Sequence, residues 1–156
     1  RLNSSNKINY TKKKIYNTLI QSHSSELNFA YGRLTFVNKT YISGGDIDCK
    51  GDTLLIEEYP RLKFSCLFNL KNKKKLLKKF SIPNNIDSSP LYLNVEGSLN
   101  LLKKKINFDK IDIGKNKANL EDMKYFKETF ESILFDDDFF SMFRKKKIKE
   151  FLLEVI

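Results

Sequence analysis

An alternation of apolar and polar residues over 90–114, PLYLNVEGSLNLLKKKINFDKIDIG, constrains this chain more than any other feature. Leu91, Leu93 and Val95 alternate with more polar neighbours, and the alternation resumes at Ile106 after a turn-like run. Successive side chains of a strand point to opposite faces, so this pattern predicts an antiparallel β-meander with one apolar face. The question is whether that apolar face packs against the rest of the protein or against a ligand that is not protein.

The alternation changes phase within the second half of this stretch. Ile106 and Phe108 share one parity. Ile111 and Ile113 share the other. Because a slip of one residue turns every following side chain to the other face, the sequence predicts either a β-bulge near residues 109–110 or partial cover of both faces.

Strand patterns also precede this stretch. Residues 27–37 predict one strand, and residues 40–58 predict two short strands that break at Gly44-Gly45 and again around Gly51-Asp52. Residues 61–70 predict a half-exposed antiparallel strand, because their alternate positions are mostly polar. The apolar side of that strand consists of Phe64, Cys66, Phe68 and Leu70.

Helical patterns flank the strands. Residues 10–21 are ambiguous but compatible with a helix, whose apolar side would consist of Ile15, Leu19 and Ile20. Residues 72–80 predict a short helix that Pro83 closes. We therefore divide the chain into three parts, namely a polar, partly helical lead-in at 1–26, an antiparallel sheet at 27–114 and a helical segment at 115–156.

The C-terminal segment begins with a helix-start signal. Asn119 is a favourable N-cap, and Glu121 and Asp122 place negative charge in the first turn. Apolar residues then follow helical spacing at Leu120, Met123, Phe126, Phe130, Ile133 and Leu134. One of the three aspartates at 136–138 is expected to cap a last helix, whose apolar stripe would be Phe140, Phe143, Phe151, Leu152 and Val155.

The two cysteines, Cys49 and Cys66, form no CxxC motif. The chain has a single histidine, which is too few to complete a usual zinc ligand set, so a zinc site is not expected. Both lie in strand-like segments, and buried free thiols are the favoured state. A cross-strand disulfide in an oxidising compartment is the alternative.

The formal net charge of +10 suggests an anionic partner, such as nucleic acid, a membrane surface or an acidic protein. Arginine, the residue suited to bidentate recognition of phosphates and bases, is rare, so nucleic acid is not the expected partner. Lysines surround the apolar stripe of the 72–80 helix. They form either a solvated helix face or a site for anionic headgroups, with Lys73, Lys74, Lys75, Lys78 and Lys79 as candidates.

Catalytic patterns are absent from the sequence. His23 lies in a Ser-rich stretch, but residues adjacent in sequence do not form a triad. The Asp136–Asp138 run lacks the ligand spacing and the glycine of a calcium loop, and the glycine pair of the 44–52 segment is followed by neither the Lys-Ser/Thr pair nor the clear helix of a P-loop. We therefore expect a non-catalytic protein without a metal or cofactor.

Residues 63–114 carry a resemblance to a known family. A strand is followed by LLKKFSIP, then by a Pro-led strand that ends in GSL, and then by INFDKIDIG. This order and spacing resemble the repeating unit of the AsmA-like superfamily. Residues 27–56 are compatible with the preceding strands of such a unit.

The resemblance implies both a fold and a function. AsmA-like proteins are anchored in the inner membrane of Gram-negative bacteria, and their periplasmic part is a twisted β-sheet curled into an apolar groove. They resemble bridge-like lipid transfer proteins and are implicated in moving phospholipid towards the outer membrane. The expected fold class is therefore α+β, mainly an antiparallel twisted sheet that forms an open apolar groove, with a short crossing helix and C-terminal helices.

The resemblance also implies binding partners and a cellular location. The chain would be a C-terminal fragment in the periplasm, joined to an N-terminal remainder that holds the membrane anchor. Phospholipid would be its ligand, with a membrane surface or an outer-membrane protein as a further partner. The expected function is phospholipid transport and outer-membrane biogenesis.

The candidate groove residues are the apolar positions of the predicted strands, namely Phe64, Phe68, Leu91, Leu93, Val95, Ile106 and Phe108. The alternative for each is an ordinary core position beneath the C-terminal helices, because alternation does not identify what covers a face. Two other functions stay open: a structural or protein-interaction module and, less favoured, a basic nucleic-acid-binding domain.

Overall fold

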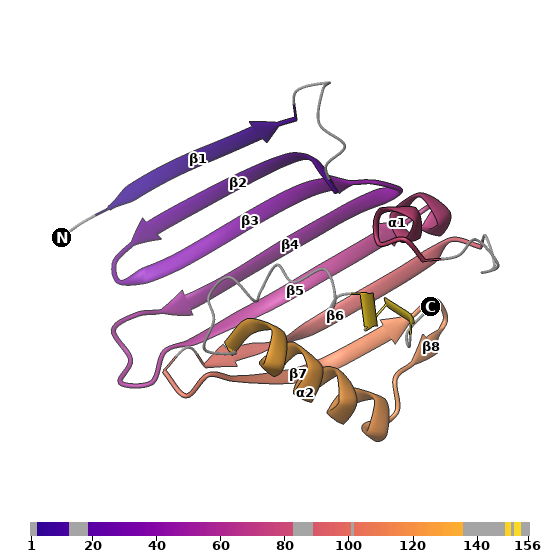
Figure 1. Ribbon diagram of the computed structural model, residues 1–156. Helices are drawn as coiled ribbons and strands as arrows, with labels where there is room; N and C mark the ends of the chain where they lie inside the picture. The colour runs from indigo at the N-terminus through magenta and orange to yellow at the C-terminus, as the bar shows by residue number, and fades with distance from the viewer. Residues whose placement is uncertain are drawn as a thin grey trace.

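The structure is a computed structural model that describes residues 3–12, 19–82, 89–100, 102–135, 149–150 and 152–153. Within these residues the chain forms one open antiparallel sheet in which every strand lies beside its neighbours in sequence, in the order β1 to β8 (Figure 1). The strands are β1 (Ser4–Thr11), β2 (Ile20–Ala30), β3 (Arg33–Ile42), β4 (Gly45–Leu54), β5 (Arg61–Leu70), β6 (Leu91–Asn100), β7 (Lys105–Ile113) and β8 (Asn116–Lys117). The helices are α1 (Lys73–Lys79) and α2 (Leu120–Phe135).

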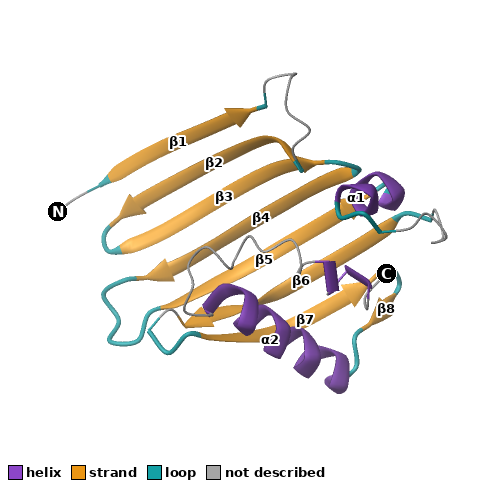
Figure 2. Ribbon diagram, viewed as in Figure 1, coloured by secondary structure: helices purple, strands orange, loops and turns teal. Residues whose placement is uncertain are grey.

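This architecture confirms the coarse fold prediction of a mainly antiparallel sheet with helices. Both helices lie on the same face of the sheet, α1 at the ends of the central strands and α2 along β6 and β7 (Figure 2). Directly paired residues share a face, so the strand register defines an apolar face and a polar face for the whole sheet. The apolar face carries the alternate residues that include Phe36, Phe64 and Val95.

The predicted β-bulge in β7 is confirmed. Glu96 pairs with Lys110 while the next residue, Gly97, pairs with Phe108, so Asp109 is the extra residue. The bulge brings the two parities of β7 to one face, because Ile111 and Phe108 both lie opposite apolar-face positions of β6. Gly114 follows the strand with φ of 62°, a conformation that glycine adopts without strain.

The prediction of one strand over 27–37 is wrong. β2 ends at Ala30 and β3 begins at Arg33, and the two residues between them form a tight hairpin turn. Tyr31 and Gly32 have φ of 53° and 76°, and two consecutive positive φ values match the right-handed twist of the flanking strands. The turn was missed because apolar residues on both sides of it look like one continuous strand in the sequence.

The predicted strand break at Gly44-Gly45 is confirmed, but the break around Gly51-Asp52 is wrong because β4 continues through it. Gly51 marks a close approach instead of a turn. A Cβ at this position would lie 2.6 Å from Cε1 of Phe36 and would also contact the backbone oxygen of Lys63. Because Gly51 has no side chain, the Phe36 ring can lie over the backbone at this position.

The helical interpretation of the N-terminal lead-in is wrong for the residues that the structure describes. Of residues 10–21, Tyr10 and Thr11 end β1, and Ile20 and Gln21 begin β2, while residues 13–18, including Ile15, lie outside the described residues. The polar side chains of this region pair across the strands: Ser5 with Asn28 and Ser24 with Asn9. This polar cross-strand ladder carries no apolar period, so the sequence pattern did not reveal it.

The short helix near 72–80 is confirmed as α1. The side chain of Asn72 accepts a hydrogen bond from the backbone N–H of Lys75 at 3.0 Å and caps the helix. The apolar stripe of α1 packs on the apolar face of the sheet. The buried cluster consists of Ile42, Leu70, Leu76, Leu77, Phe80 and Ile82. Pro83, expected to close the helix, lies outside the described residues.

Helix α2 begins as predicted. The side chain of Asn119 accepts from the N–H of Asp122 at 2.8 Å, and Asp122 accepts in return from the N–H of Asn119 at 3.3 Å. Phe126 on this helix is buried against Val95 and Ile111. The predicted Asp136–Asp138 cap lies outside the described residues, as does most of the last helix.

The expectation of free thiols is wrong, because Cys49 and Cys66 form a disulfide between β4 and β5. The two cysteines lie directly opposite each other in the register, with Cα atoms 4.1 Å apart. This spacing suits a directly paired position in an antiparallel ladder. The register of β4 against β5 could not be inferred from the residues alone, so the meeting of the two cysteines was not predicted.

Candidate functional site

All seven candidate groove residues lie on the apolar face of the sheet, as predicted from their alternation. Four of them are partly buried beside the core cluster of α2, namely Phe64, Phe68, Leu93 and Phe108. The rings of Phe64 and Phe108 meet edge to face with centroids 6.3 Å apart, and Phe108 meets Phe130 of α2 at 5.8 Å. These aromatic side chains hold α2 on the sheet.

The other three candidates are also in contact with a core. Val95 and Ile106 are buried, and Leu91 packs against the cluster of α1. Glu131 of α2 accepts a hydrogen bond from the backbone N–H of Ile106 at 2.8 Å, so the helix binds the strand by a polar contact as well. For Val95 and Ile106 the structure favours the alternative of a core beneath α2, whereas Leu91 packs against the core of α1.

The apolar face continues beyond this core into the first three strands. We use the name open apolar surface for a set of side chains on β1, β2 and β3, namely Ile8, Tyr10, Leu27, Phe29, Leu34 and Phe36. Ile8 and Tyr10 are 54% and 46% exposed, and the other four are half-buried. Neither buried core cluster of the described residues includes a residue of β1 or β2.

The sequence prediction missed this surface. Leu27 and Phe29 have odd numbers, whereas Leu34 and Phe36 have even numbers, so one continuous strand would place them on opposite faces. The hairpin turn at Tyr31-Gly32 brings all four to one face. Recognition of that turn as a hairpin signal would have revealed the surface.

Hydrogen-bonded polar pairs lie among the apolar side chains of this surface. The hydroxyl of Ser25 donates to the side-chain oxygen of Asn38 at 2.6 Å, and Nδ1 of His23 lies 2.8 Å from the hydroxyl oxygen of Thr40. His23 is therefore a sheet residue with a cross-strand partner.

The opposite face of the sheet is polar and carries cross-strand ion pairs. Lys7 contacts Glu26 at 2.8 Å and Arg33 contacts Asp52 at 2.7 Å. The hydrogen bond and charge of Lys7 lower the pKa of Glu26 below its ordinary value. The two faces therefore differ in chemistry along the full width of the sheet.

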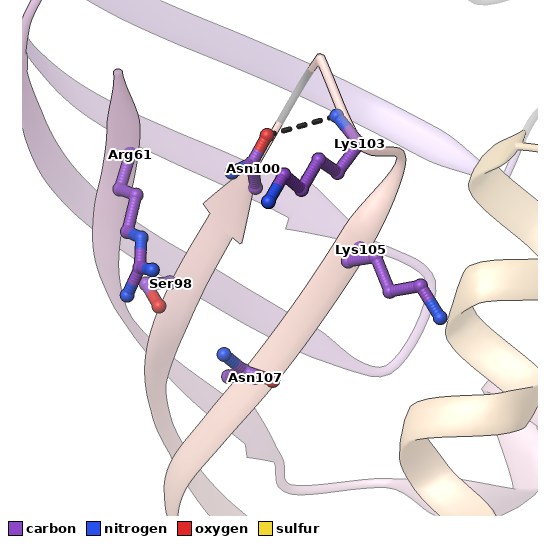
Figure 3. Close-up of a pocket in the computed structure, with 6 residues that line it drawn as sticks. All are labelled: Arg61, Ser98, Asn100, Lys103, Lys105 and Asn107. Carbon is purple, nitrogen blue, oxygen red and sulfur yellow. Dashed lines mark hydrogen bonds between the residues drawn. The ribbon is translucent and has the colours of Figure 1, made fainter. Parts of the chain in front are cut away.

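A shallow hollow of about 160 Å³ lies on this polar face near one end of β5, β6 and β7. It is lined by Arg61, Ser98, Asn100, Lys103, Lys105 and Asn107 (Figure 3). Figure 3 shows the side chain of Lys103 beside Asn100, whose side-chain oxygen accepts from the Lys103 backbone N–H at 2.9 Å. The side chains that line this hollow end in amides, a hydroxyl and cations, so it offers hydrogen-bonding groups and positive charge.

The candidate headgroup lysines lie on α1, which packs on the apolar face. Lys74, Lys75 and Lys78 are exposed, and Lys79 is half-buried. Lys73 is buried, with 7% of its surface exposed, and so does not belong to the exposed set. The remaining lysines place positive charge at the end of the apolar face where β3 ends and β4 begins.

Among the described residues, no group of three or more His, Cys, Asp or Glu side chains could hold a metal ion. Neither helix in the described part of the chain has the length and hydrophobicity needed to cross a membrane. Comparison with models of protein families, with curated proteins and with solved structures finds no match.

Proposed function

We propose that the open apolar surface binds the acyl chains of phospholipid, and that this chain is a lipid-conducting section of an AsmA-like protein in the periplasm. One observation carries the proposal: the apolar face extends from β7 to β1, but the buried cores beneath the two described helices reach only as far as the end of β3 and include no residue of β1 or β2. The first half keeps apolar side chains exposed on a regular sheet. Its role would be non-catalytic, in phospholipid transport towards the outer membrane.

The physical basis of binding is burial of acyl chains. Each methylene that leaves water is worth about 0.8 kcal/mol, so a row of apolar side chains holds a tail without specific polar contacts. The headgroup would remain in water, and the exposed lysines of α1 would attract its phosphate.

The disulfide between Cys49 and Cys66 supports the proposed compartment. Structural disulfides form and persist in oxidising environments such as the bacterial periplasm and are rare in the cytosol of mesophiles. The order of segments in residues 63–114, which resembles the AsmA-like unit, supports the same location.

A protein-interaction module is the second candidate function. An exposed apolar patch with polar surroundings is also typical of a protein-binding surface, and Ile8 and Tyr10 lie on the outermost strand. Lipid analysis separates the two candidates, because a protein-binding surface does not require bound phospholipid.

The experiment is native mass spectrometry with lipid extraction, on the chain purified from a bacterial membrane background. The test variant carries Phe29→Asp and Leu34→Asp, which place charge on the open apolar surface. The control carries Val37→Asp. Val37 lies on β3 like Leu34, but it points to the polar face of the sheet and is 57% exposed. We expect phospholipid on the unmodified chain and on the control, and loss of lipid from the test variant.

Circular dichroism and thermal unfolding check that the test variant keeps its fold. Leu93 and Phe108 are unsuitable for this purpose, since charge at either position would disrupt the core beneath α2. Lipid-free unmodified protein, or equal lipid binding by the folded test variant, would contradict the proposal.

A further inference from the structure

The hollow on the polar face is built from paired positions of three neighbouring strands. Arg61 of β5, Asn100 of β6 and Lys105 of β7 lie directly opposite one another in one row of the register. Ser98 of β6 and Asn107 of β7 lie opposite each other in the next row. The middle strand therefore supplies an amide and a hydroxyl, and the strands on either side supply two cations and a second amide (Figure 3).

Both amides of the hollow have their oxygens in contact with protein donors. The side-chain oxygen of Asn100 accepts from the backbone N–H of Lys103 at 2.9 Å, and that of Asn107 accepts from Nζ of Lys127 on α2 at 3.3 Å. A backbone N–H or an ammonium group can only donate, so these contacts determine the orientation of each amide. The Nδ2 groups are therefore the ends that can bind a ligand, and they are donors.

Three cations add positive charge to these donors. Arg61, Lys103 and Lys105 line the hollow and are exposed. Nζ of Lys103 lies 5.3 Å from the ring centroid of Tyr59, a cation–π contact that holds this ammonium group at the rim. Figure 3 shows the guanidinium of Arg61 directed towards Ser98, whereas the side chain of Lys105 extends away from the other five. Arg61 and Lys103 are therefore the cations placed for direct contact with a ligand.

None of the six residues that line the hollow is acidic. Elsewhere on the polar face, cations lie beside carboxylates, as Arg33 does at 2.7 Å from Asp52. The lining of the hollow instead combines cations with N–H donors. Such a set is complementary to an anion with several acceptor oxygens, and the planar fork of a guanidinium suits phosphate oxygens in particular.

We propose that this hollow binds a phosphate group, with Arg61 and Lys103 opposing its charge and Asn100 and Asn107 donating to its oxygens. The volume of about 160 Å³ is below the roughly 300–1,000 Å³ of pockets that enclose drug-sized ligands, so it suits a small group. The hollow lies on the face opposite the open apolar surface. The proposal therefore does not rest on acyl-chain binding by that surface.

The phosphate can come from solution or from a lipid headgroup at a membrane surface. The neighbouring side chains favour the headgroup: Leu102, adjacent to Lys103, is 66% exposed, and Tyr59 is 51% exposed. Tyrosine is enriched at membrane–water interfaces, and lysine is attracted to anionic headgroups. We therefore expect anionic vesicles to bind at this end of the sheet.

NMR titration of the side-chain amides tests the site directly. Inorganic phosphate is added to ¹⁵N-labelled protein, with sodium chloride at equal ionic strength as the control for screening. The Nδ2 signals of Asn100 and Asn107 should shift with phosphate and not with chloride. The signal of Asn28, whose side chain pairs with Ser5 in the β1–β2 ladder, should shift with neither.

A matched pair of arginine variants separates the hollow from net charge. Arg61→Ala should raise the dissociation constant for phosphate about tenfold, because it removes a charge-assisted hydrogen bond. Arg33→Ala removes the same charge from the same face outside the hollow and should change the constant less than twofold. Asn107→Asp keeps an acceptor for Lys127 but replaces the donor with a negative charge, and it should abolish binding.

Co-sedimentation with phosphatidylglycerol vesicles, compared with phosphatidylcholine vesicles, identifies the source of the phosphate. Weaker binding of Arg61→Ala than of Arg33→Ala to the anionic vesicles would assign the headgroup, and equal binding would assign free phosphate. The Phe29→Asp and Leu34→Asp variant should keep its phosphate-dependent shifts, so loss of acyl-chain binding leaves this site intact. Absence of any phosphate-specific shift at Asn100 and Asn107, or equal weakening of phosphate binding by the two arginine variants, would overturn the proposal.

Discussion

Strands β5–β7 and strands β1–β3 present the same face of one sheet, but only the first group lies beneath α2. In the covered group, Val95 is 9% exposed and faces Phe126 of the helix, which is 5% exposed. In the open group, Ile8 keeps more than half of its surface in water. The same face of one sheet therefore provides two different environments.

The difference lies in what the other segments of the chain supply. The covered group meets a helix whose apolar residues recur at helical spacing and face the sheet. The open group instead mixes apolar side chains with polar pairs such as Ser25–Asn38 and His23–Thr40. Each pair supplies a hydrogen bond between its own side chains, so a polar group such as Ser25, which is 6% exposed, lies on this half of the face with its hydrogen bond satisfied.

The largest expected effect tests the difference in burial between the two groups. Phe126→Ala should lower the free energy of unfolding by about 3–5 kcal/mol, because it removes a buried ring between Val95 and Ile111. Phe29→Ala in the open group should lower it by about 1 kcal/mol or less, since Phe29 is only half-buried. Urea unfolding followed by circular dichroism measures both values.

The comparison between these two phenylalanines uses the same substitution, so the removed atoms are identical. A cost for Phe29→Ala that approaches that of Phe126→Ala would show that the open group is covered in solution. It would also remove the surface on which the lipid proposal depends.

The next effect concerns the disulfide, which joins β4 and β5 where the two groups meet. The cysteines are 17 residues apart, and a cross-link of about this span stabilises a protein by roughly 3 kcal/mol in the chain-entropy description. Unfolding of the unmodified chain in urea should therefore shift to lower denaturant when a reductant is added. A double variant, Cys49→Ser with Cys66→Ser, should not respond to the reductant, and the same midpoint with and without reductant in the unmodified chain would contradict the structural role.

Much of the fold could be predicted from local pattern. The alternation of β5, β6 and β7 gave their apolar faces, and the change of phase at Asp109 gave the bulge. Asn119 gave the start of α2, because a capping side chain acts on backbone groups only two or three residues away. These features are determined within a few residues of sequence.

The rest depended on contacts between distant residues. Prediction of the disulfide would have needed the register of β4 against β5. Prediction of β1 and the start of β2 would have needed the polar cross-strand pairs, such as Ser5–Asn28, which leave no apolar period in the sequence. The open apolar surface required the turn at Tyr31-Gly32. Most of the candidate groove residues are buried because α2 packs on them, and the sequence of the strands does not reveal that this helix packs there.

A smaller effect compares two glycines on the apolar face. At Gly97 a Cβ would contact the backbone oxygen of Asn107 and lie 3.0 Å from Cζ of Phe64, which is packed beside the α2 core. At Gly51 a Cβ would likewise contact a backbone oxygen, that of Lys63, and would lie 2.6 Å from Cε1 of Phe36, a ring of the open apolar surface that can move towards water. Both substitutions should therefore cost about 1–3 kcal/mol, with Gly97→Ala the larger because its ring neighbour is packed. Thermal unfolding of the two variants measures the difference, and equal costs would indicate that Phe36 is held as firmly as Phe64.

The smallest effect lies on the polar face, where the two groups of strands should behave alike. A hydrogen bond from Lys110 lowers the pKa of Asp112 in β7, and a hydrogen bond from Lys7 lowers the pKa of Glu26 in β2. A carboxyl group whose pKa is lower in the folded state stabilises the fold at neutral pH, and this contribution is lost as the pH falls through the folded pKa. Lys110→Ser and Lys7→Ser should each raise the pKa of the partner carboxyl towards its ordinary value, as followed by NMR titration of the side-chain carboxyl carbons. Because both sites face solvent, added salt should reduce both shifts. A response at Asp112 alone would mean that the difference between the two groups extends through the sheet to its polar face, and that α2 influences more than the residues it covers.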